Sequence, residues 1–549
     1  MERETVLNHL EDLLWTLPVF LYAETHYRFR YFFSILRKHE PEVIADAPHR
    51  IDPSQDIPLL ILAKDAHRFP ATISSVRVVV RSDGRTVRET ELLREPVDLS
   101  TPMWWNVYQL ERNGISGWVE IDVQIQLTTS GKTRAYSADN HRTSSHAPLR
   151  VYLSEEPLPK EQGMYFGDAH THSDRTDDQV EFGVPIAAAV RLSKPLGLSF
   201  FCVADHSYDL DDAVDDFSSN DPAIPKWTSL LDDIQKHNNQ ASDFAVIQGE
   251  EISCRNGRGQ NVHLLLFGNN HFFPGSGDGA ERWLRTRSEH SITEILDQKL
   301  QNAPAFAAHP LEPVSLLQRL LLGRGTWSFS DFSSVKLAGI QFANGIRNKG
   351  FLKGYRAWVA ALLAGKRVYC LAGNDAHGNF NRFRQIGVPF MKIREHNHQL
   401  FGKMRTAVFL NDQPNQPAFL RSLTEGSFVI TDGPVMNIRL LEVSPGSTSI
   451  GSNLEGSAFD FTLSVHSSKE FGTIKEVRVL LGTIGTRSES VFLSEKLVDT
   501  YAHTRSLTIH VTEPMYLRAE AFTSEDNESD GFEHFCYTNP IWLTPPLLR

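Results

Sequence analysis

The sequence predicts a multidomain α/β protein in which a central domain, with a parallel sheet or a (β/α) barrel, is flanked by two β-sandwiches. The chain has 549 residues, whereas a single hydrophobic core stops growing at about 250 to 300 residues. Alternating apolar and polar runs occupy both outer parts, and the middle alternates short apolar runs with helix-like segments. We therefore expect a helical segment at 1–44, a β-sandwich at 45–158, an α/β domain at 159–432 and a second β-sandwich at 433–549.

The outer segments carry the pattern of immunoglobulin-like sandwiches. Runs such as SSVRVVVRSDG and WVEIDVQIQLTTSGK in the first, and FDFTLSVHSS and RSLTIHVTE in the second, alternate apolar and polar residues between Asp-Gly or Ser-Gly turns. The two sandwiches are expected to scaffold or cover the central domain, with carbohydrate or partner binding as the alternative. An oligomer formed through them is a further expectation, and the amphipathic segment 1–44 is either a packing arm or an oligomerisation element.

The central segment predicts strands that end in ligand-type residues. Apolar runs such as GMYFGDAH, LSFFCVADH and FAVIQGEE alternate with helical stretches, one of which opens with Ser291 and Glu294 in capping-box spacing. Almost every run ends in His, Asp, Glu or Asn. Because barrel enzymes build their sites at the carboxyl ends of the strands, this coincidence indicates a catalytic domain.

Bulk composition excludes several classes of protein. A formal charge of -12 argues against nucleic acid as a structural partner. The four cysteines show no CxxC spacing, which argues against a disulfide framework or a thiolate zinc site and fits a reducing compartment. The first residues make a poor signal peptide, and no apolar run reaches the roughly 20 residues of a membrane span. We expect a cytoplasmic protein with no membrane partner.

The strand-end residues predict a polynuclear metal site. His170 and His172 are two apart, so in an extended chain both imidazoles point to one face and can reach one ion. Nine nitrogen and oxygen donors without a thiolate are too many for one ion and imply two or three divalent ions, either Zn, Mn or Fe. The candidate ligands are His170, His172, Asp177, His206, Glu251, His263, His309, Asp375 and His377.

Six short motifs, taken in their order along the chain, resemble those of the PHP (polymerase and histidinol phosphatase) superfamily. They are GDAHTH with Asp177 beyond it, ADHS, GEEIS, VHLLLF, AHP and NDAH. This resemblance implies a distorted (β/α)7 barrel with a trinuclear metal site, which usually hydrolyses phosphoesters. The second sandwich and the ending YTNPIWL resemble the CehA/McbA-like branch of metallohydrolases, some of which cleave carbamates or esters. Two departures are Asp178, which could displace or assist Asp177, and Ala204, where the family has Thr.

The expected mechanism uses a water shared by two cations, which lowers its pKa toward neutrality and makes it the nucleophile. Glu251 is the expected bridging ligand, because strand parity turns Glu250 the other way. His206 is the candidate proton donor to the leaving oxygen, and Asp205 is expected to orient an imidazole or to serve as an extra ligand. Candidate substrate contacts for an anionic group are Arg347, Lys349, Arg382 and Arg384.

The predicted function is that of a metal-dependent hydrolase acting on a small-molecule ester, with a phosphoester as the first expectation. A carboxylic ester or carbamate hydrolase on the same metal site is the alternative. A zinc amidohydrolase barrel also begins with HxH, but it needs fewer ligands than the nine present here. A non-catalytic scaffold would be expected to have lost ligands.

Overall fold

The computed structural model describes most of the chain. The described residues are 40–141, 144–176, 183–214, 216–240, 243–279, 286–382, 385–388, 391–394, 399–411, 413–444, 446–523 and 534–546. Nearly all of the expected helical segment 1–44, together with the expected metal ligand Asp177, its neighbour Asp178 and the expected substrate contact Arg384, lies outside them.

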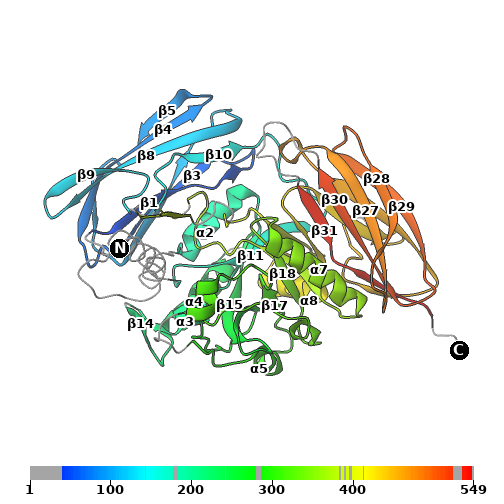
Figure 1. The fold of residues 1–549 in the computed structure, drawn as a ribbon. Helices are drawn as coiled ribbons and strands as arrows, with labels where there is room; N and C mark the ends of the chain where they lie inside the picture. The colour runs from blue at the N-terminus through cyan, green and yellow to red at the C-terminus, as the bar shows by residue number, and fades with distance from the viewer. Residues whose placement is uncertain are drawn as a thin grey trace, which may run out of the picture.

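The N-terminal part packs two sheets face to face, and their strands are antiparallel except at the parallel β2–β10 pair (Figure 1). The first has the order β1 (Glu42–Asp46), β3 (Ile57–Lys64), β7 (Met103–Leu110). The second has the order β2 (Arg50–Ile51), β10 (Leu149–Leu153), β8 (Gly117–Thr129), β4 (Ala71–Ser82), β5 (Arg85–Glu91), with β6 (Val97–Leu99) on β4 and β9 (Lys132–Ser137) on β8.

Local sequence accounts for these sheets. Every second residue of β8 from Val119 to Leu127 is buried between the sheets. Asp83 and Gly84 both have positive φ, 48° and 72°, as the two central residues of a tight β4–β5 hairpin require.

A second set of strands forms the central sheet. Its order is β19 (Tyr369–Gly373), β18 (Gly339–Asn344), β17 (Ala305–Ala308), β16 (Asn261–Phe267), β15 (Ala245–Arg255), β12 (Phe200–Val203), β11 (Met164–Thr171), β22 (Arg405–Phe409), β23 (Phe428–Thr431). The α-helices of this region are α2 (Ile186–Ser193), α3 (Ser207–Leu210), α4 (Pro225–Gln240), α5 (Ile292–Gln298), α6 (Leu316–Leu321), α7 (Lys349–Leu363) and α8 (Gln416–Glu425). The short pairs β13–β14 (Asp212–Ala213, Asp216–Asn220) and β20–β21 (Gln385–Val388, Met391–Arg394) and the 3-10 turns η1 (Lys194–Leu196) and η2 (Asp331–Ser333) complete it. The capping box expected at Ser291 and Glu294 is confirmed at the start of α5.

The expected α/β fold with a distorted (β/α)7 barrel is wrong. Strand β16 runs antiparallel to both of its neighbours, and β22 runs antiparallel to β11. The turn 256–260 joins β15 to β16 without a helix. The sheet continues through β23 into C-terminal strands, so that it holds 15 described strands in a mostly β protein. Buried apolar runs look alike in parallel and antiparallel strands, which is why the sequence alone misassigned their directions.

The C-terminal strands form a second pair of sheets, on the far side of the central part from the first pair (Figure 1). One holds β24 (Val435–Leu440), β26 (Ala458–His466) and β29 (Ala502–His510). The other extends the central sheet through β31 (Phe535–Thr538), β30 (Met515–Thr523), β27 (Ile474–Thr483) and β28 (Ser490–Lys496), with β32 (Ile541–Thr544) on β30 and β25 (Asn453–Glu455) on β32. The turn η3 (Lys469–Phe471) precedes β27. The β23–β31 ladder therefore crosses the boundary expected at residue 433.

A buried arginine ties the three parts together. Arg50 of β2 donates through Nε to both oxygens of Glu470, at 2.8 and 2.9 Å, and through Nη1 to the carbonyl of Leu196 at 3.1 Å. Its side chain is 3% exposed, and that of Glu470 is 12% exposed. Because the partners lie in the C-terminal and central parts, this residue fixes how the N-terminal sandwich is held against them.

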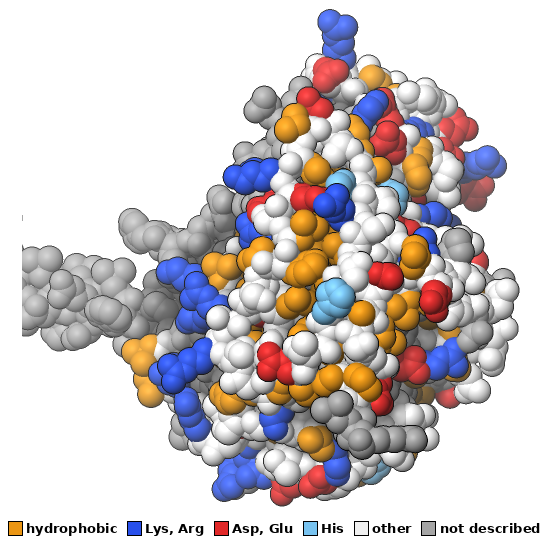
Figure 2. Space-filling model, turned by 90° about the vertical axis from the view of Figure 1, so that its right-hand side faces the viewer, with side chains coloured by type: hydrophobic (Ala, Val, Ile, Leu, Met, Phe, Trp, Pro, Cys, Tyr) orange, Lys and Arg blue, Asp and Glu red, His pale blue; other side chains and the backbone are white. Residues whose placement is uncertain are grey.

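The helices, the cysteines and the exposed apolar residues can be compared with the expectations about membrane spans, disulfides and oligomerisation. In the described part of the chain, no helix is long and apolar enough to cross a membrane. All four cysteines are unbridged and buried. Figure 2 looks onto the C-terminal side, where hydrophobic side chains lie among charged and neutral ones; exposed apolar residues of the C-terminal strands include Val491 and Phe492. Oligomerisation through the sandwiches stays a prediction.

Candidate metal centre

The ends of strands β11 and β19 lie next to each other at the first histidine motif. His170 is the penultimate residue of β11 and His172 follows the strand. The backbone N–H of His172 donates to the carbonyl of Ala376 at 2.9 Å, just beyond β19. A Cβ on Gly373 would lie 2.5 Å from the His170 Cβ, so a glycine is needed for β19 to approach β11 this closely. The contact brings Asp375 beside both imidazoles, at 3.4 Å from His170 Nε2 and 3.0 Å from His172 Nε2.

Glu251 of β15 lies fully buried at the centre of the histidines. Its Oε1 is 2.7 Å from His263 Nδ1 and 3.0 Å from His309 Nε2. Its Oε2 faces three more imidazole nitrogens, at 3.0 Å in His206, 3.2 Å in His170 and 3.5 Å in His172. The two oxygens of one carboxylate therefore face different sets of imidazoles, which is the arrangement that a bridging ligand needs.

Three groups of ligand atoms are each compact enough to hold one ion, with all their atoms within 4.8 Å of one another. Glu251 belongs to two of the groups, and so does His206. The groups are His172, His206 and His377; His170, Glu251, His309 and Asp375; and His206, Glu251 and His263. The structure thus brings together eight of the nine expected ligands, and Asp177 is the ninth.

Buried amide and carbonyl groups set the orientation of two rings. Gln341 of β18 accepts a hydrogen bond from the backbone N–H of His309 through Oε1 at 3.0 Å. The same oxygen lies 3.2 Å from His170 Nδ1, so this ring nitrogen must carry the hydrogen and donate it. His377 Nδ1 lies 3.1 Å from the carbonyl of Asp375 and must likewise donate. The Nε2 atoms of His170 and His377 are therefore the lone-pair nitrogens, as metal ligands require.

His263 is held by buried Asp278 and half-buried Arg324, two residues that the sequence did not predict for the site. Asp278 accepts from His263 Nε2 at 2.9 Å, from Arg324 Nε at 2.6 Å and from the Ser253 hydroxyl. Arg324 Nη2 also lies 3.0 Å from His263 Nε2. Asp278 and Arg324 lie in irregular loops without motif spacing, so no signal in the sequence could have selected them.

The charges of the cluster suit cations. Burial alone would raise the pKa of Glu251, but His263, His170 and His206 outweigh it and hold that pKa well below the usual range. The pKa of Asp375 is also held low, because His170 and His172 outweigh its burial. Burial, with His377 and His206 nearby, holds the pKa of His172 well below its usual range and keeps that ring neutral. Carboxylates and neutral imidazoles are the forms that bind metal. The pKa values of His170 and His263 are instead raised, that of His263 to about 10, because nearby carboxylates outweigh burial. A bound ion would therefore have to displace protons from these two rings.

Three further observations fit divalent ions. The Nδ1 atom of His172 is buried without a hydrogen-bond partner in the described structure, a costly state unless a ligand satisfies it. His309 and Asp375 have positive φ, 27° and 53°, a conformation that residues with side chains rarely adopt and that is concentrated at functional sites. The donor set is nitrogen and oxygen only, as Zn, Mn and Fe accept.

Other expected site residues lie elsewhere. Asp205 accepts the backbone N–H and the hydroxyl of Ser173, both at 2.6 Å, and the Thr176 hydroxyl at 3.1 Å. It therefore fixes the turn after His172, and it makes no hydrogen bond to an imidazole in the described structure.

The three expected substrate contacts that the structure describes do not line the cavity beside the cluster. Arg382 is buried and donates to the carbonyls of Ala45 and Ser145. Arg347 lies over the ring of Phe535, at 5.3 Å. Lys349 is exposed as the first residue of α7. Arg382 and Arg347 thus contact other parts of the protein, and Lys349 faces solvent. A basic residue close to a ligand motif in the sequence need not face the site in the folded chain.

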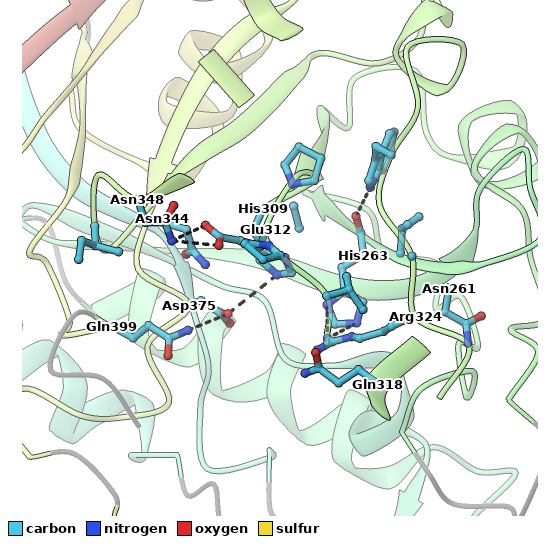
Figure 3. A pocket seen from close by; sticks show the side chains of 18 residues that line it. Asn261, His263, His309, Glu312, Gln318, Arg324, Asn344, Asn348, Asp375 and Gln399 are labelled. Atoms are coloured by element: carbon cyan, nitrogen blue, oxygen red, sulfur yellow. Dashed lines mark hydrogen bonds and ion pairs between the residues drawn. The ribbon is translucent and has the colours of Figure 1, made fainter. Parts of the chain in front are cut away.

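A cavity of about 430 Å³ opens beside the cluster. Its wall includes His263, His309 and Asp375 from the ligand groups. Figure 3 shows Glu312, Asn344, Asn348 and Gln399 near His309 and Asp375, and Gln318, Arg324 and Asn261 near His263. Arg324 is the one lysine or arginine among the described lining residues. A small polar molecule can therefore reach the ligand groups from this side.

No family model and no curated protein matches this chain. Solved structures similar to it include a glycosyl hydrolase family 2 member from Bacteroides cellulosilyticus, with 11% identity, a TM-score of 0.17, and coverage of 92% of this chain and 63% of that chain. A putative beta-galactosidase from Bacteroides fragilis has 10% identity, a TM-score of 0.21, and coverage of 92% and 73%. Beta-D-mannosidase from Dictyoglomus thermophilum has 8% identity, a TM-score of 0.23, and coverage of 90% and 66%. The chain spans less than two thirds of the length of the first of these.

The expected membership in the PHP superfamily and its CehA/McbA-like branch is contradicted. No family model matches, and the described sheet, with β16 antiparallel to both neighbours and β22 antiparallel to β11, lacks the barrel which that membership implied. Short ligand motifs indicate which side chains can lie close together. Membership in a superfamily requires that the sequence and fold correspond over the whole domain.

Proposed function

We propose that this protein is a metal-dependent hydrolase of ester bonds with two or three divalent ions at the centre built around Glu251. The observation that carries the proposal is the buried Glu251 carboxylate, whose two oxygens face five imidazole nitrogens between 2.7 and 3.5 Å away. An isolated buried carboxylate is costly, and hydrogen bonds alone do not explain five rings turned toward it. Divalent ions shared between the ligand groups account for the arrangement.

Divalent ions bound here would supply Lewis acidity, polarising the scissile ester and lowering the pKa of a water. The chain's own residues hold the site ready for this. Glu251 and Asp375 contribute negative charge, Gln341 keeps Nε2 of His170 directed inward, and Asp278 keeps His263 in place. Because His206 belongs to two ligand groups, we assign it to metal binding rather than to proton donation.

The substrate class proposed first is a small phosphoester, since clustered cations stabilise phosphoryl oxygens. A carboxylic ester or carbamate is the second candidate. It is favoured by the cavity wall, in which carboxamides such as Asn344, Asn348 and Gln399 accompany a single arginine among the described residues. Such a wall offers hydrogen bonds to a neutral ester more readily than charge to a polyanion.

The test combines metal analysis with hydrolysis. Purified protein is stripped with a chelator, reloaded with Zn, Mn or Fe, and assayed on p-nitrophenyl phosphate, bis-p-nitrophenyl phosphate, p-nitrophenyl acetate and a p-nitrophenyl carbamate. We expect two or three bound ions per chain, loss of hydrolysis on stripping and its return on reloading. His309→Ala should lower both metal content and turnover, whereas His510→Ala, on the exposed face of β29, should not. Full activity without metal, or no hydrolysis by metal-loaded protein, overturns the proposal.

A further inference from the structure

Glu312 stands on the cavity wall one turn beyond His309. The backbone N–H of Glu312 donates to the carbonyl of His309 at 3.2 Å, so its position follows that of a candidate ligand. Its half-buried side chain lines the cavity. Figure 3 shows the carboxylate between His309 and Asn348. None of the three ligand groups includes it.

The start of α7 holds this carboxylate in place. Asn348 caps the helix by accepting the N–H of Phe351 at 2.9 Å through Oδ1, which turns its Nδ2 toward Glu312. That Nδ2 donates to both carboxylate oxygens at 3.0 Å. A Cβ on Gly350 would lie 2.4 Å from the carboxyl carbon, so only glycine leaves room for it. The positive end of the 15-residue helix also favours an anion here.

The carboxylate keeps acceptor capacity on the cavity side. A carboxylate offers about four lone-pair sites, and Asn348 is the one group in the described structure that hydrogen-bonds to its oxygens. The cavity's arginine, Arg324, lies on the other side, where it is bound to Asp278 and His263. The cavity thus has an accepting, negative side and a donating, positive side.

We propose that Glu312 is a specificity-determining residue that selects substrates with a hydrogen-bond donor, a hydroxyl or an ammonium group, on the part next to the scissile bond. A fixed carboxylate gains a charge-assisted hydrogen bond from such a group and repels a second anionic group. The inference rests on the proposed function, because it places the scissile bond at the metal centre. The competing explanation is that Glu312 only stabilises the start of α7.

The experiment measures the dissociation constants of three alkyl phosphates with the metal-loaded full-length protein by calorimetry. Phosphoethanolamine carries an ammonium group, 2-hydroxyethyl phosphate a hydroxyl, and ethyl phosphate neither. We expect at least one of the first two to bind about tenfold more tightly than ethyl phosphate. A preference confined to phosphoethanolamine identifies an ammonium, and one shared by both identifies a hydroxyl-type donor. Equal binding of all three, or no binding of either donor probe, overturns the inference.

Variants separate recognition from a structural role. Glu312→Gln should bring the ratio of dissociation constants close to one, and Glu312→Asp should retain part of the preference. Glu294→Gln is the matched control, because Glu294 stabilises the start of α5 and should leave the ratio unchanged. Equal weakening of all three probes by Glu312→Gln, together with a lower melting temperature, would assign a structural role only. Hydrolysis without donor preference refutes the inference alone, whereas donor preference without hydrolysis of any ester refutes the proposed function alone.

Discussion

Glu250 and Glu251 are neighbours in the chain, yet their buried carboxylates face opposite sides of β15. Glu251 faces the histidines, whereas Glu250 accepts from the Ser207 hydroxyl at 2.9 Å and from the backbone N–H of Phe273 at 3.1 Å. Burial raises the pKa of Glu250 well above its usual range, with the Ser207 and Phe273 hydrogen bonds opposing. Burial thus favours the protonated form of Glu250, whereas Glu251 next to it favours the charged form. The two side chains reach different surroundings because successive side chains of a strand alternate.

Replacing the two glutamates one at a time should have unequal effects. Glu251→Gln should remove at least one bound ion and nearly all hydrolysis, because an amide cannot serve as an anionic bridge. Glu250→Gln should retain metal and most turnover, because an amide resembles the protonated acid and can still accept a hydrogen bond. Elemental analysis and turnover of both variants check this. A metal-replete Glu251→Gln protein beside a metal-poor Glu250→Gln protein would refute the assignment.

Asp278 should matter for metal affinity although it is not among the ligand groups. Asp278→Asn weakens the hold on His263, and losses of outer partners of this kind typically cost about 10- to 100-fold in metal affinity. Competition with a chelator of known affinity measures the change. Asp297→Asn, at an exposed pair with Lys336, is the control. An unchanged metal affinity in Asp278→Asn would show that His263 does not depend on this carboxylate.

Arg50→Ala should destabilise the whole molecule, because it leaves Glu470 buried without its partner. Breaking a buried ion pair from one side costs about 3 to 5 kcal/mol, which urea unfolding can measure. The pair of exposed Arg505 and partly exposed Glu495, at 3.3 Å, offers the comparison. Arg505→Ala should cost no more than about 1 kcal/mol. Similar losses in the two variants would mean that the buried pair contributes no more than a surface pair.

Titration of the buried Asp46 carboxyl group should make the free energy of unfolding depend on pH. Burial raises its pKa from 3.8 to about 6, against the opposing effects of Arg382 and of backbone N–H groups that include Phe380. Between these values the native state holds a proton that the unfolded state has released, so this contribution is present below pH 3.8 and is lost as the pH rises through about 6. Across this pH range the free energy of unfolding should fall by about 3 kcal/mol.

Asp46→Asn removes that titration. The unfolding free energy of the original protein, measured relative to the variant, should fall between pH 3.8 and about 6 and stay level above it. Urea unfolding of both proteins across this window provides the measurement. A difference that is constant with pH would show that Asp46 titrates alike in the folded and unfolded chain.

Local sequence rules explain part of the candidate site. The two-residue repeat of an extended chain places His170 and His172 on one face and separates Glu251 from Glu250. The capping box at Ser291 also follows from neighbours in sequence. These features depend on residues a few positions apart, whose geometry the backbone sets by itself.

Strand direction, fold class and the outer partners of the site were decided by tertiary structure. Apolar runs report burial but not direction, so the antiparallel course of β16 and the ladder from β23 to β31 could not be inferred from them. Asp278 and Arg324 reach His263, and Glu312 reaches the cavity wall, from loops whose sequence neighbours carry no pattern. Spacing along the chain thus determined which side chains could share a face, whereas long-range packing determined which faces meet, because contacts between distant segments depend on the path of the whole chain.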